Sequence, residues 1–367
     1  MQKPFARHYI ACVLLPCGAQ HQLAATHCCY AAVALLTKPA LYSRLVKHIA
    51  VLTSGGDAPG MNPAIRAVVR TAIAQGLQVS AVFRGYQGLI DDDIKSFGPR
   101  DVANIIQRGG TVLRTARCRH FFSSEGRSQA VANLKARGIE GLVVIGGDGS
   151  FRGAEALHRE HDFPVVGLPG TIDNDIYGTD VSIGFNTALD IALNAIDRLR
   201  DTAASHDRMF LVEVMGRHAG HIALYVGVAG GAEEILLPEV PVNIERVVAS
   251  LREAEARGKA SSIVVVAEGA CEGGALAIAQ ALHDQCSFEV RTSILGHIQR
   301  GGSPCTRDRV LASRLGHGAV KALLEGHNGI MIGIRGRSIR HVPLRDTWEK
   351  RKELDWQLYE TAKLLTV

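Results

Sequence analysis

Short apolar runs alternate with helical patterns from about residue 46 to the end of the chain. The runs are apolar almost without interruption, as strands buried on both faces are. They predict strands at Ile49–Leu52, Ala81–Phe83, Leu142–Ile145, Val165–Leu168, Phe210–Val214, Ile263–Ala267 and Ile330–Ile334. Residues 62–75 place apolar side chains at i, i+3, i+4 and i+7, and residues 189–196 repeat this spacing, so both segments are predicted helices. Asn62 followed by Pro63 is typical of an N-cap and a first helical residue.

This alternation predicts an α/β fold in which helices cover parallel sheets. Ligands of such folds bind beyond the carboxyl ends of the strands, where the strand order reverses. A length of 367 residues is enough for about two domains.

Residues 1–45 differ in composition from the rest of the chain. They contain four Lys or Arg, no Asp or Glu, and four of the eight cysteines, and they show no period of helix or strand. Lys3 and Arg7 before an apolar run are compatible with a signal peptide, and the absence of acids with a transit peptide. We prefer the interpretation that this extension lies outside the folded domains and that the native protein starts near Val46.

The remaining composition excludes several classes of protein. Beyond residue 45 there are 37 basic and 36 acidic residues, so we expect no general attraction to nucleic acid or membranes. Aromatic residues make up only 5%, which disfavours base-stacking surfaces. The cysteines of this part are scattered, which is typical of a reducing cytoplasm. They are Cys118, Cys271, Cys286 and Cys305.

Three predicted strand ends combine glycine with aspartate. They are Thr53–Gly60, Gly146–Ser150 and Pro169–Asp175. Glycine turns let backbone N–H groups approach an anion, and a following helix N-terminus adds partial positive charge. The carboxylates would repel one another if they converged, and a divalent cation would relieve that repulsion, as in phosphoryl transfer. The alternative is that each Asp only caps a turn; neither a Walker A loop nor a dinucleotide-binding fingerprint is present.

Arginines gather near other predicted strand ends. Arginine binds phosphate through a planar fork of donors. Residues 295–302 are glycine-rich and are predicted to form a loop that presents His297 and Arg300. Glu268 follows a strand and is a candidate acceptor for sugar hydroxyls, although a solvated strand end is nearly as good an interpretation. The arginines are Arg208, Arg217, Arg291 and Arg300.

From about Lys47 onward the chain resembles the bacterial-type 6-phosphofructokinases, the ATP-dependent branch of the phosphofructokinase family. The matching segments are Leu52–Asn62, Ile145–Ser150, Pro169–Asp175, Val212–Arg217 and Gly296–Gly302. The last is specific to the family, whereas Gly-Gly-Asp-Gly also occurs in NAD and lipid kinases. The resemblance implies transfer of the ATP γ-phosphoryl group to the 1-hydroxyl of fructose 6-phosphate, with Mg²⁺, in a cytoplasmic homotetramer.

The resemblance also implies two similar three-layer αβα domains with mainly parallel sheets and the active site in the cleft between them. The expected ATP-binding domain comprises residues 46–185 and about 298–347. The expected fructose 6-phosphate-binding domain comprises residues 186–297 and about 348–367.

Site residues follow from the resemblance position by position. Asp173 is the expected general base, with Thr171 and Arg217 as further catalytic residues and Asp148 at the Mg²⁺. The expected ATP-binding residues are Gly56, Arg117, Cys118, Gly147, Asp148, Gly149 and Ser150. The expected sugar-phosphate residues are Thr171, Ile172, Asp173, Arg208, Met215, Gly216, Arg217, Glu268, Arg291, His297, Ile298, Gln299 and Arg300. Of these, Arg208 and Arg291 are expected to reach in from a neighbouring subunit.

Two glycines indicate the phosphoryl donor. Pyrophosphate-dependent members of the family typically carry Asp at the position of Gly149 and Lys at that of Gly170, so this chain is expected to use ATP. The alternatives are a pyrophosphate-dependent enzyme and a non-catalytic sensor of sugar phosphates or nucleotides.

An effector site for a nucleotide or phosphoenolpyruvate is also expected at a subunit interface. Its residues are Arg66, Arg70, Arg200, Gly231, Glu233, Arg257 and Lys259. Pro99 and Arg114 depart from the family pattern, where Arg and Gly are usual.

Overall fold

The computed structural model describes residues 46–203, 209–258, 262–283, 285 and 289–365. The expected extension 1–45, together with Arg208, Lys259 and Cys286, lies outside the described residues. Within the described ranges, no helix has the length and apolar character that a membrane crossing requires.

The larger sheet of the described chain has seven strands in the order β11-β10-β5-β4-β1-β2-β3. The five inner strands run parallel, and β3 and β11 are antiparallel edges. The strands are β1 (His48–Thr53), β2 (Gln78–Val82), β3 (Ile94–Ser96), β4 (Gly141–Gly146), β5 (Val165–Pro169), β10 (Ile330–Arg335) and β11 (Ser338–Pro343).

The smaller sheet has four parallel strands in the order β7-β8-β6-β9. They are β6 (Met209–Val214), β7 (Glu234–Leu236), β8 (Ser262–Ala267) and β9 (Val290–Ile294). The α/β class with mainly parallel sheets is therefore confirmed. The division of the chain into two domains with the expected boundaries stays a prediction, although each sheet is built from the segments expected for one of them.

All seven predicted strands are present, and four strands were missed. β3 and β7 have only three residues each. β9 and β11 carry polar side chains and are only partly buried, so neither has the continuous apolar run of a central strand.

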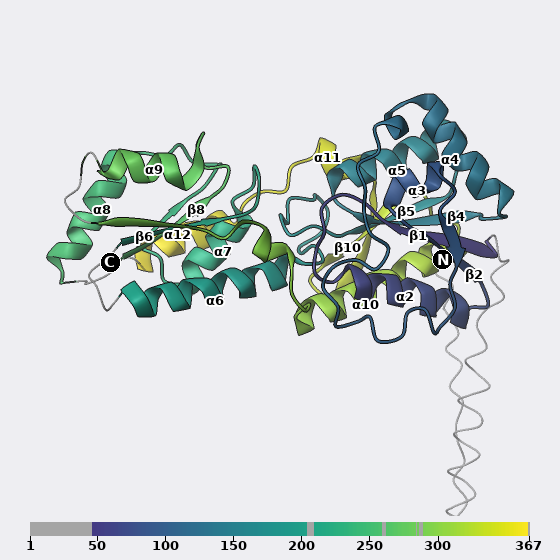
Figure 1. Ribbon diagram of the computed structural model, residues 1–367, viewed down its shortest axis with the longest axis horizontal. Helices are drawn as coiled ribbons and strands as arrows, with labels where there is room; N and C mark the ends of the chain where they lie inside the picture. The colour runs from purple at the N-terminus through teal and green to yellow at the C-terminus, as the bar shows by residue number, and fades with distance from the viewer. Residues whose placement is uncertain (1–45, 204–208, 259–261, 284, 286–288, 366–367) are drawn as a thin grey trace, which may run out of the picture. The chain divides into compact units, whose positions relative to one another are not determined.

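Helices cover both faces of the seven-stranded sheet. Figure 1 shows α2 (Met61–Ala74) and α10 (Thr306–Leu324) on one face. On the other face lie α3 (Gly85–Ile90), α4 (Ser124–Ala136), α5 (Asp148–His161) and α11 (Asp346–Glu349). Side chains of β1 alternate between the two cores: Ile49 and Val51 pack with the first pair of helices, Ala50 and Leu52 with the other group. The period of two residues in a strand explains this alternation.

The four-stranded sheet is covered in the same way. One core joins it to α6 (Phe185–Ala203), α7 (His221–Ala229) and α12 (Trp356–Leu365). A separate core on its other face includes residues of α8 (Ile244–Ala256) and α9 (Gly274–His283). Two short 3₁₀ turns complete the set, η1 (His120–Phe122) and η2 (Gly296–Arg300). The prediction of a loop at 295–302 was thus partly wrong, because one tight helical turn fits between the flanking glycines.

The predicted N-cap at Asn62 is wrong. Gly60 occupies that position with φ 120°, and Asn62 is the second residue of α2. The Asn62 side chain is fully buried and serves a distant segment. Its Nδ2 donates to the carbonyls of Arg108 (3.0 Å) and Gly110 (2.8 Å), and its Oδ1 accepts from the N–H of Val112 (2.8 Å).

This correction gives a test by substitution. A cap would tolerate Asp at position 62, but a carboxylate cannot donate to the carbonyls of Arg108 and Gly110. We expect Asn62→Asp to lower the free energy of unfolding by roughly 2–4 kcal/mol in urea denaturation. Asn243→Asp is the matched control, because Asn243 only accepts, from the N–H of Arg246 (2.7 Å) just inside α8. Equal effects of the two changes would contradict the structure.

Candidate functional site

The strand order reverses once in each sheet, and the candidate residues lie at these points. β1 has β2 on one side and β4 on the other. The loops after β1 and β4 meet there, where the N–H of Ser54 donates to the carbonyl of Ile145 (3.0 Å). In the smaller sheet β6 lies between β8 and β9, and the N–H of Met215 donates to Gln299 Oε1 (2.8 Å). Such reversal points are where ligands of α/β sheets bind.

The turn after β4 has the geometry of an anion-binding site. Gly147 is extended, and the 14-residue helix α5 begins at Asp148, so the free N–H groups of its first turn face the strand end. A Cβ on Gly146 would lie 2.5 Å from the carbonyl oxygen of Ser54, so only glycine fits there. A Cβ on Gly149 would meet no atom within 4 Å. Packing of the described protein atoms therefore does not require glycine at 149.

Asp148 has a cationic partner that the sequence did not reveal. Its Oδ1 lies 2.9 Å from Nε of Arg152, one helical turn later. The Arg152 guanidinium also lies over the Trp348 ring, 5.3 Å from the centroid. The Asp148 side chain keeps 43% of its surface exposed, so it stays accessible to a ligand.

Asp173 lies in the loop after β5 and is buried, with only 3% of its surface exposed. Its Oδ2 lies 3.6 Å from Nε of Arg217. Burial and the neighbouring Asp175 raise the pKa of Asp173 to about 6, although Arg300 and Arg217 act in the opposite direction. Burial, together with Asp148, also raises the pKa of Asp175. Asp175 thus acts on Asp173, and Asp148 acts on Asp175.

Thr171 is fixed between two loops. Its hydroxyl accepts from the N–H of Asp173 (3.2 Å), and its carbonyl accepts from Ser182 Oγ (2.7 Å). A Cβ on Gly147 would lie 3.6 Å from Thr171 Cβ, which places the glycine turn directly beside it.

Buried polar atoms without a hydrogen-bond partner concentrate at these loops. Among the described residues there are four such atoms, and three belong to expected site residues: Ser150 Oγ, Asp173 Oδ1 and Gln299 Nε2. Unpaired buried groups are rare and costly in folded proteins. Their clustering indicates positions where a ligand supplies the missing partner.

Glu268 shapes the turn after β6. Its Oε1 accepts from the N–H groups of Gly216 (3.2 Å) and Arg217 (2.7 Å). Both residues have positive φ, 141° and 53° respectively. The carboxylate thus stabilises a strained turn and points the Arg217 side chain at Asp173. The contact of Glu268 with sugar hydroxyls stays a prediction.

Arg300 joins the turn η2 to the loop after β1. Its Nη1 donates to the carbonyl of Asp57 (3.2 Å), and a Cβ on Gly56 would lie 2.7 Å from the same nitrogen. Gly56 therefore allows the guanidinium to approach the glycine-rich loop. His297 and Ile298 of the same turn are exposed, and Gln299 is buried.

Further expected residues come from β9 and from the segment before η1. Arg291 is exposed at the start of β9 and forms an ion pair with Glu289. Arg117 is exposed and Cys118 half-buried, in the segment before η1.

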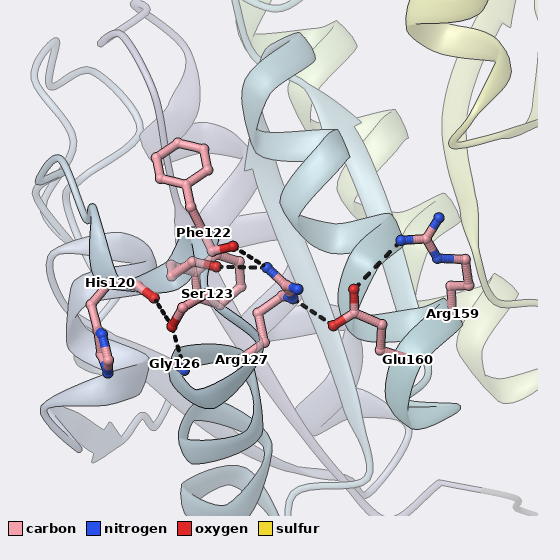
Figure 2. Close-up of polar contacts among 8 residues, drawn as sticks. His120, Phe122, Ser123, Gly126, Arg127, Arg159 and Glu160 are labelled. Carbon is pink, nitrogen blue, oxygen red and sulfur yellow. Dashed lines mark hydrogen bonds and ion pairs between the residues drawn. The ribbon is translucent and has the colours of Figure 1, made fainter.

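A polar network fixes the segment that follows Cys118 (Figure 2). Ser123 caps α4 by accepting from the N–H of Gly126 (3.1 Å). Arg127 donates to the carbonyl of Phe122 (2.8 Å) and to Glu160 Oε2 of α5 (2.6 Å). This network ties η1, α4 and α5 together. The contact to α5 is made near the C-terminal end of that helix, at Glu160.

Tyr86 makes a second link between the same parts and was missed in the sequence. Its hydroxyl donates to the carbonyl of Ser150 (2.5 Å), and its ring stacks on Phe121 at 4.0 Å between centroids. The available signal was its place three residues after the end of the predicted strand Ala81–Phe83.

Comparison with known proteins decides the family. A profile of the family described as phosphofructokinase matches residues 48–323. The chain belongs to the phosphofructokinase family.

Relatives support this over the full body of the chain. ATP-dependent 6-phosphofructokinase 1 of Thermus thermophilus is 57% identical over 322 residues, which cover 88% of this chain and 100% of that protein. The ATP-dependent 6-phosphofructokinase of Shouchella clausii is 52% identical with the same coverage. The solved structure of phosphofructokinase from Saccharomyces cerevisiae matches with a TM-score of 0.79 and 38% identity, over 88% of this chain and 48% of the yeast chain. This chain thus spans about half the length of the yeast one.

In this family member, the backbone at position 114 explains why glycine is the usual residue there. Arg114 adopts φ 59°, a left-handed conformation that glycine reaches at no cost. Its carbonyl accepts from Thr53 Oγ1 (3.1 Å), which holds the strained residue against the end of β1.

The expected effector residues fall into two groups. Arg66, which is half-buried, and Arg70, which is exposed, lie on α2, a helix that packs on the seven-stranded sheet. Arg200 of α6 donates to the carbonyls of Gly230 (2.6 Å) and Gly231 (2.8 Å). Glu233 accepts from the N–H of Ile263 (2.5 Å), and Arg257 lies 3.9 Å from Glu253. Their union in one effector site stays a prediction.

The donor set is compatible with a magnesium ion shared with a substrate. The described residues contain no group of three or more His, Cys, Asp or Glu suited to hold a metal. Mg²⁺ typically binds through one or two carboxylates together with substrate phosphates and water. A single accessible carboxylate at Asp148, beside a glycine turn suited to phosphate, fits that mode.

The burial of Asp173 predicts an effect on stability. A carboxyl whose pKa rises from 3.8 to about 6 on folding binds its proton more tightly in the folded state. The free energy of unfolding therefore falls as the pH rises from about 4 to 6, and above pH 6 the buried charge continues to destabilise the folded state. We expect Asp173→Asn to raise the free energy of unfolding at pH 7.5 by roughly 1–3 kcal/mol. The gain should shrink as the pH falls below 6, measured by urea denaturation at each pH; a gain independent of pH would contradict the raised pKa.

Proposed function

We propose that this protein transfers the γ-phosphoryl group of ATP to the 1-hydroxyl of fructose 6-phosphate, giving fructose 1,6-bisphosphate and ADP. The observation that carries the proposal is Asp173, a buried carboxylate with one unpaired oxygen beside Arg217. Relatives named ATP-dependent 6-phosphofructokinase are 52–57% identical to this chain over 322 residues, which cover the whole of each relative.

Asp173 acts as the general base. A pKa of about 6 leaves the carboxylate ionised at neutral pH and close to the pH at which proton transfer is efficient. It takes the proton of the 1-hydroxyl while that oxygen bonds to the γ-phosphorus. The bond from the γ-phosphorus to the bridging oxygen breaks, and the electron pair leaves with ADP.

The arginines supply the positive charge that phosphates need. Arg217 lies close enough to Asp173 to stabilise charge that develops at the attacking oxygen and the transferred group. Arg300 and His297, both on η2, bind the 6-phosphate. Arg208 and Arg291 from a neighbouring subunit of a homotetramer bind the same group. Ile172, Met215 and Gly216 line the sugar.

On the nucleotide side, Gly56, Gly147, Ser150, Arg117 and Cys118 bind ATP. Asp148 would hold Mg²⁺, which would neutralise charge on the phosphates. In that role Asp148 would have to leave its ion pair with Arg152.

ATP is favoured over pyrophosphate by the space at Gly149. No described atom lies within 4 Å of a Cβ there, so the glycine leaves room that a nucleotide phosphate can use. Gly170 differs, because a Cβ would lie 3.1 Å from Ile145 Cγ2 and 3.2 Å from Met61 Cε, so local packing also favours glycine. A pyrophosphate-dependent enzyme is the alternative, and a non-catalytic sensor is disfavoured because Asp148, Thr171, Asp173 and Arg217 are all present.

Regulation and location complete the proposal. Arg66, Arg70 and the group around Arg200 bind a nucleotide or phosphoenolpyruvate at a subunit interface, and the enzyme works in the cytoplasm.

The donor is tested by direct comparison. We expect a coupled assay with fructose 6-phosphate and Mg²⁺ to give turnover with ATP and at least 100-fold less with pyrophosphate. Gly149→Asp should fold normally, since its side chain has space, yet lose most ATP-dependent turnover through charge repulsion. Comparable turnover of the wild type with both donors, or none with either, would refute the proposal.

The base is tested by removing its carboxylate. We expect Asp173→Ser to lower kcat by about 10²–10⁴-fold, the usual contribution of a general base. Binding of fructose 6-phosphate, followed by calorimetry, should change little. Near-normal turnover would show that another group takes the proton.

A further inference from the structure

Lys352 lies in the segment between α11 and α12 and reaches the loop that follows Asp173. Its Nζ donates to Asn174 Oδ1 (2.8 Å) and to the carbonyl of Asp180 (2.8 Å). The side chain is half-buried. Neighbouring Lys350 is exposed and instead pairs with Asp346 (2.7 Å).

Asn174 connects Lys352 to the expected catalytic residues. It is buried and adopts φ 55°, so its backbone conformation needs support. Its Oδ1 also accepts from the N–H of Ser182 (3.0 Å), and Ser182 Oγ donates to the carbonyl of Thr171 (2.7 Å). The turn from Thr171 to Asn174, with Asp173 inside it, is therefore held at both ends by one network.

The charge of Lys352 is costly where it lies. Burial lowers the pKa of Lys352 to about 8, although Asp180 and Asp175 act in the opposite direction. His221, the first residue of α7, interacts electrostatically with the same ammonium. Burial is the larger cause and Lys352 the smaller cause that lower the pKa of His221 to about 4. An ammonium with two neutral oxygens as acceptors has a smaller electrostatic gain than one paired with a carboxylate. The two hydrogen bonds of Lys352 therefore serve to hold the loop of residues 174–180 in place.

We propose that Lys352 is a positioning residue, which holds Asn174 and thereby keeps the Asp173 carboxylate aimed at the acceptor hydroxyl. This inference rests on the proposed function. A misplacement of about 1 Å at a reacting group can lower a rate by about 10²-fold. Lys352 should therefore control turnover and leave the affinity for both substrates unchanged.

The test compares Lys352→Met with Lys350→Met in the full-length protein. We expect Lys352→Met to lower kcat by about 10- to 100-fold, with KM for ATP and fructose 6-phosphate within about twofold of the wild type. Lys352→Arg, which keeps donors and charge, should recover part of the loss, and Lys350→Met should change nothing. Should Lys352→Met fail to fold, Lys352→Gln replaces it, because the shorter amide cannot reach both acceptors.

A double-mutant cycle identifies the route. Asn174→Gly keeps the left-handed backbone but removes the acceptor, so it should lower kcat to a similar extent. The double variant should be no slower than Asn174→Gly alone. Additive losses, an unchanged kcat, or a rise in KM without a fall in kcat would overturn the positioning role. The positioning role would also be overturned if Lys352→Met shifted the acid limb of the pH profile of kcat and left the limiting kcat unchanged. That result would indicate that Lys352 acts through its charge. A wild type without phosphotransfer would refute the proposed function itself.

Discussion

The reversal of strand order beside β1 is the constraint on which the site depends. The chain places β2 and β3 on one side of β1 and then returns to place β4 and β5 on the other side. The connections after β1 and β4 therefore leave on opposite faces of the sheet and expose backbone between them. Glycine at 146 lets the two loops touch, and α5 starts with its N–H groups turned toward the opening. Every expected nucleotide contact in the described loops after β1 and β4 is arranged around that one opening.

The second constraint is electrostatic. A carboxylate buried as deeply as Asp173 is unfavourable beside Asp175, and Arg217 and Arg300 only partly offset this. Both arginines come from turns of the smaller sheet, after β6 and in η2. The turn after β6 is in turn fixed by Glu268, which uses one oxygen to hold two backbone N–H groups. The basicity of Asp173 thus depends on turns distant in sequence. Asp173 Oδ1 and Gln299 Nε2 are buried and have no hydrogen-bond partner among the described protein atoms.

The fold class and the candidate site were predictable for different reasons. Central parallel strands are buried on both faces and so appear as apolar runs, whereas β9 and β11 have exposed polar positions and gave no such signal. The glycine and aspartate at strand ends are local features that a sequence displays directly. Asn62 was misread because its hydrogen bonds go to residues 46 to 50 positions away. Lys352 was invisible for the same reason, since 178 positions separate it from Asn174. Long-range side-chain contacts have no periodic signature.

The pairing of β5 with β10 has a consequence for synthesis. The outer edge of β5, which ends at Pro169, has no strand to pair with until the ribosome has added Ile330. At roughly 5–20 residues per second, this interval lasts on the order of 10–30 s. During that time an apolar strand with free N–H and C=O groups is open to pairing with other chains. The nascent protein therefore has a window of aggregation risk that closes only when its last tenth emerges, and truncation before β10 would leave that edge permanently exposed.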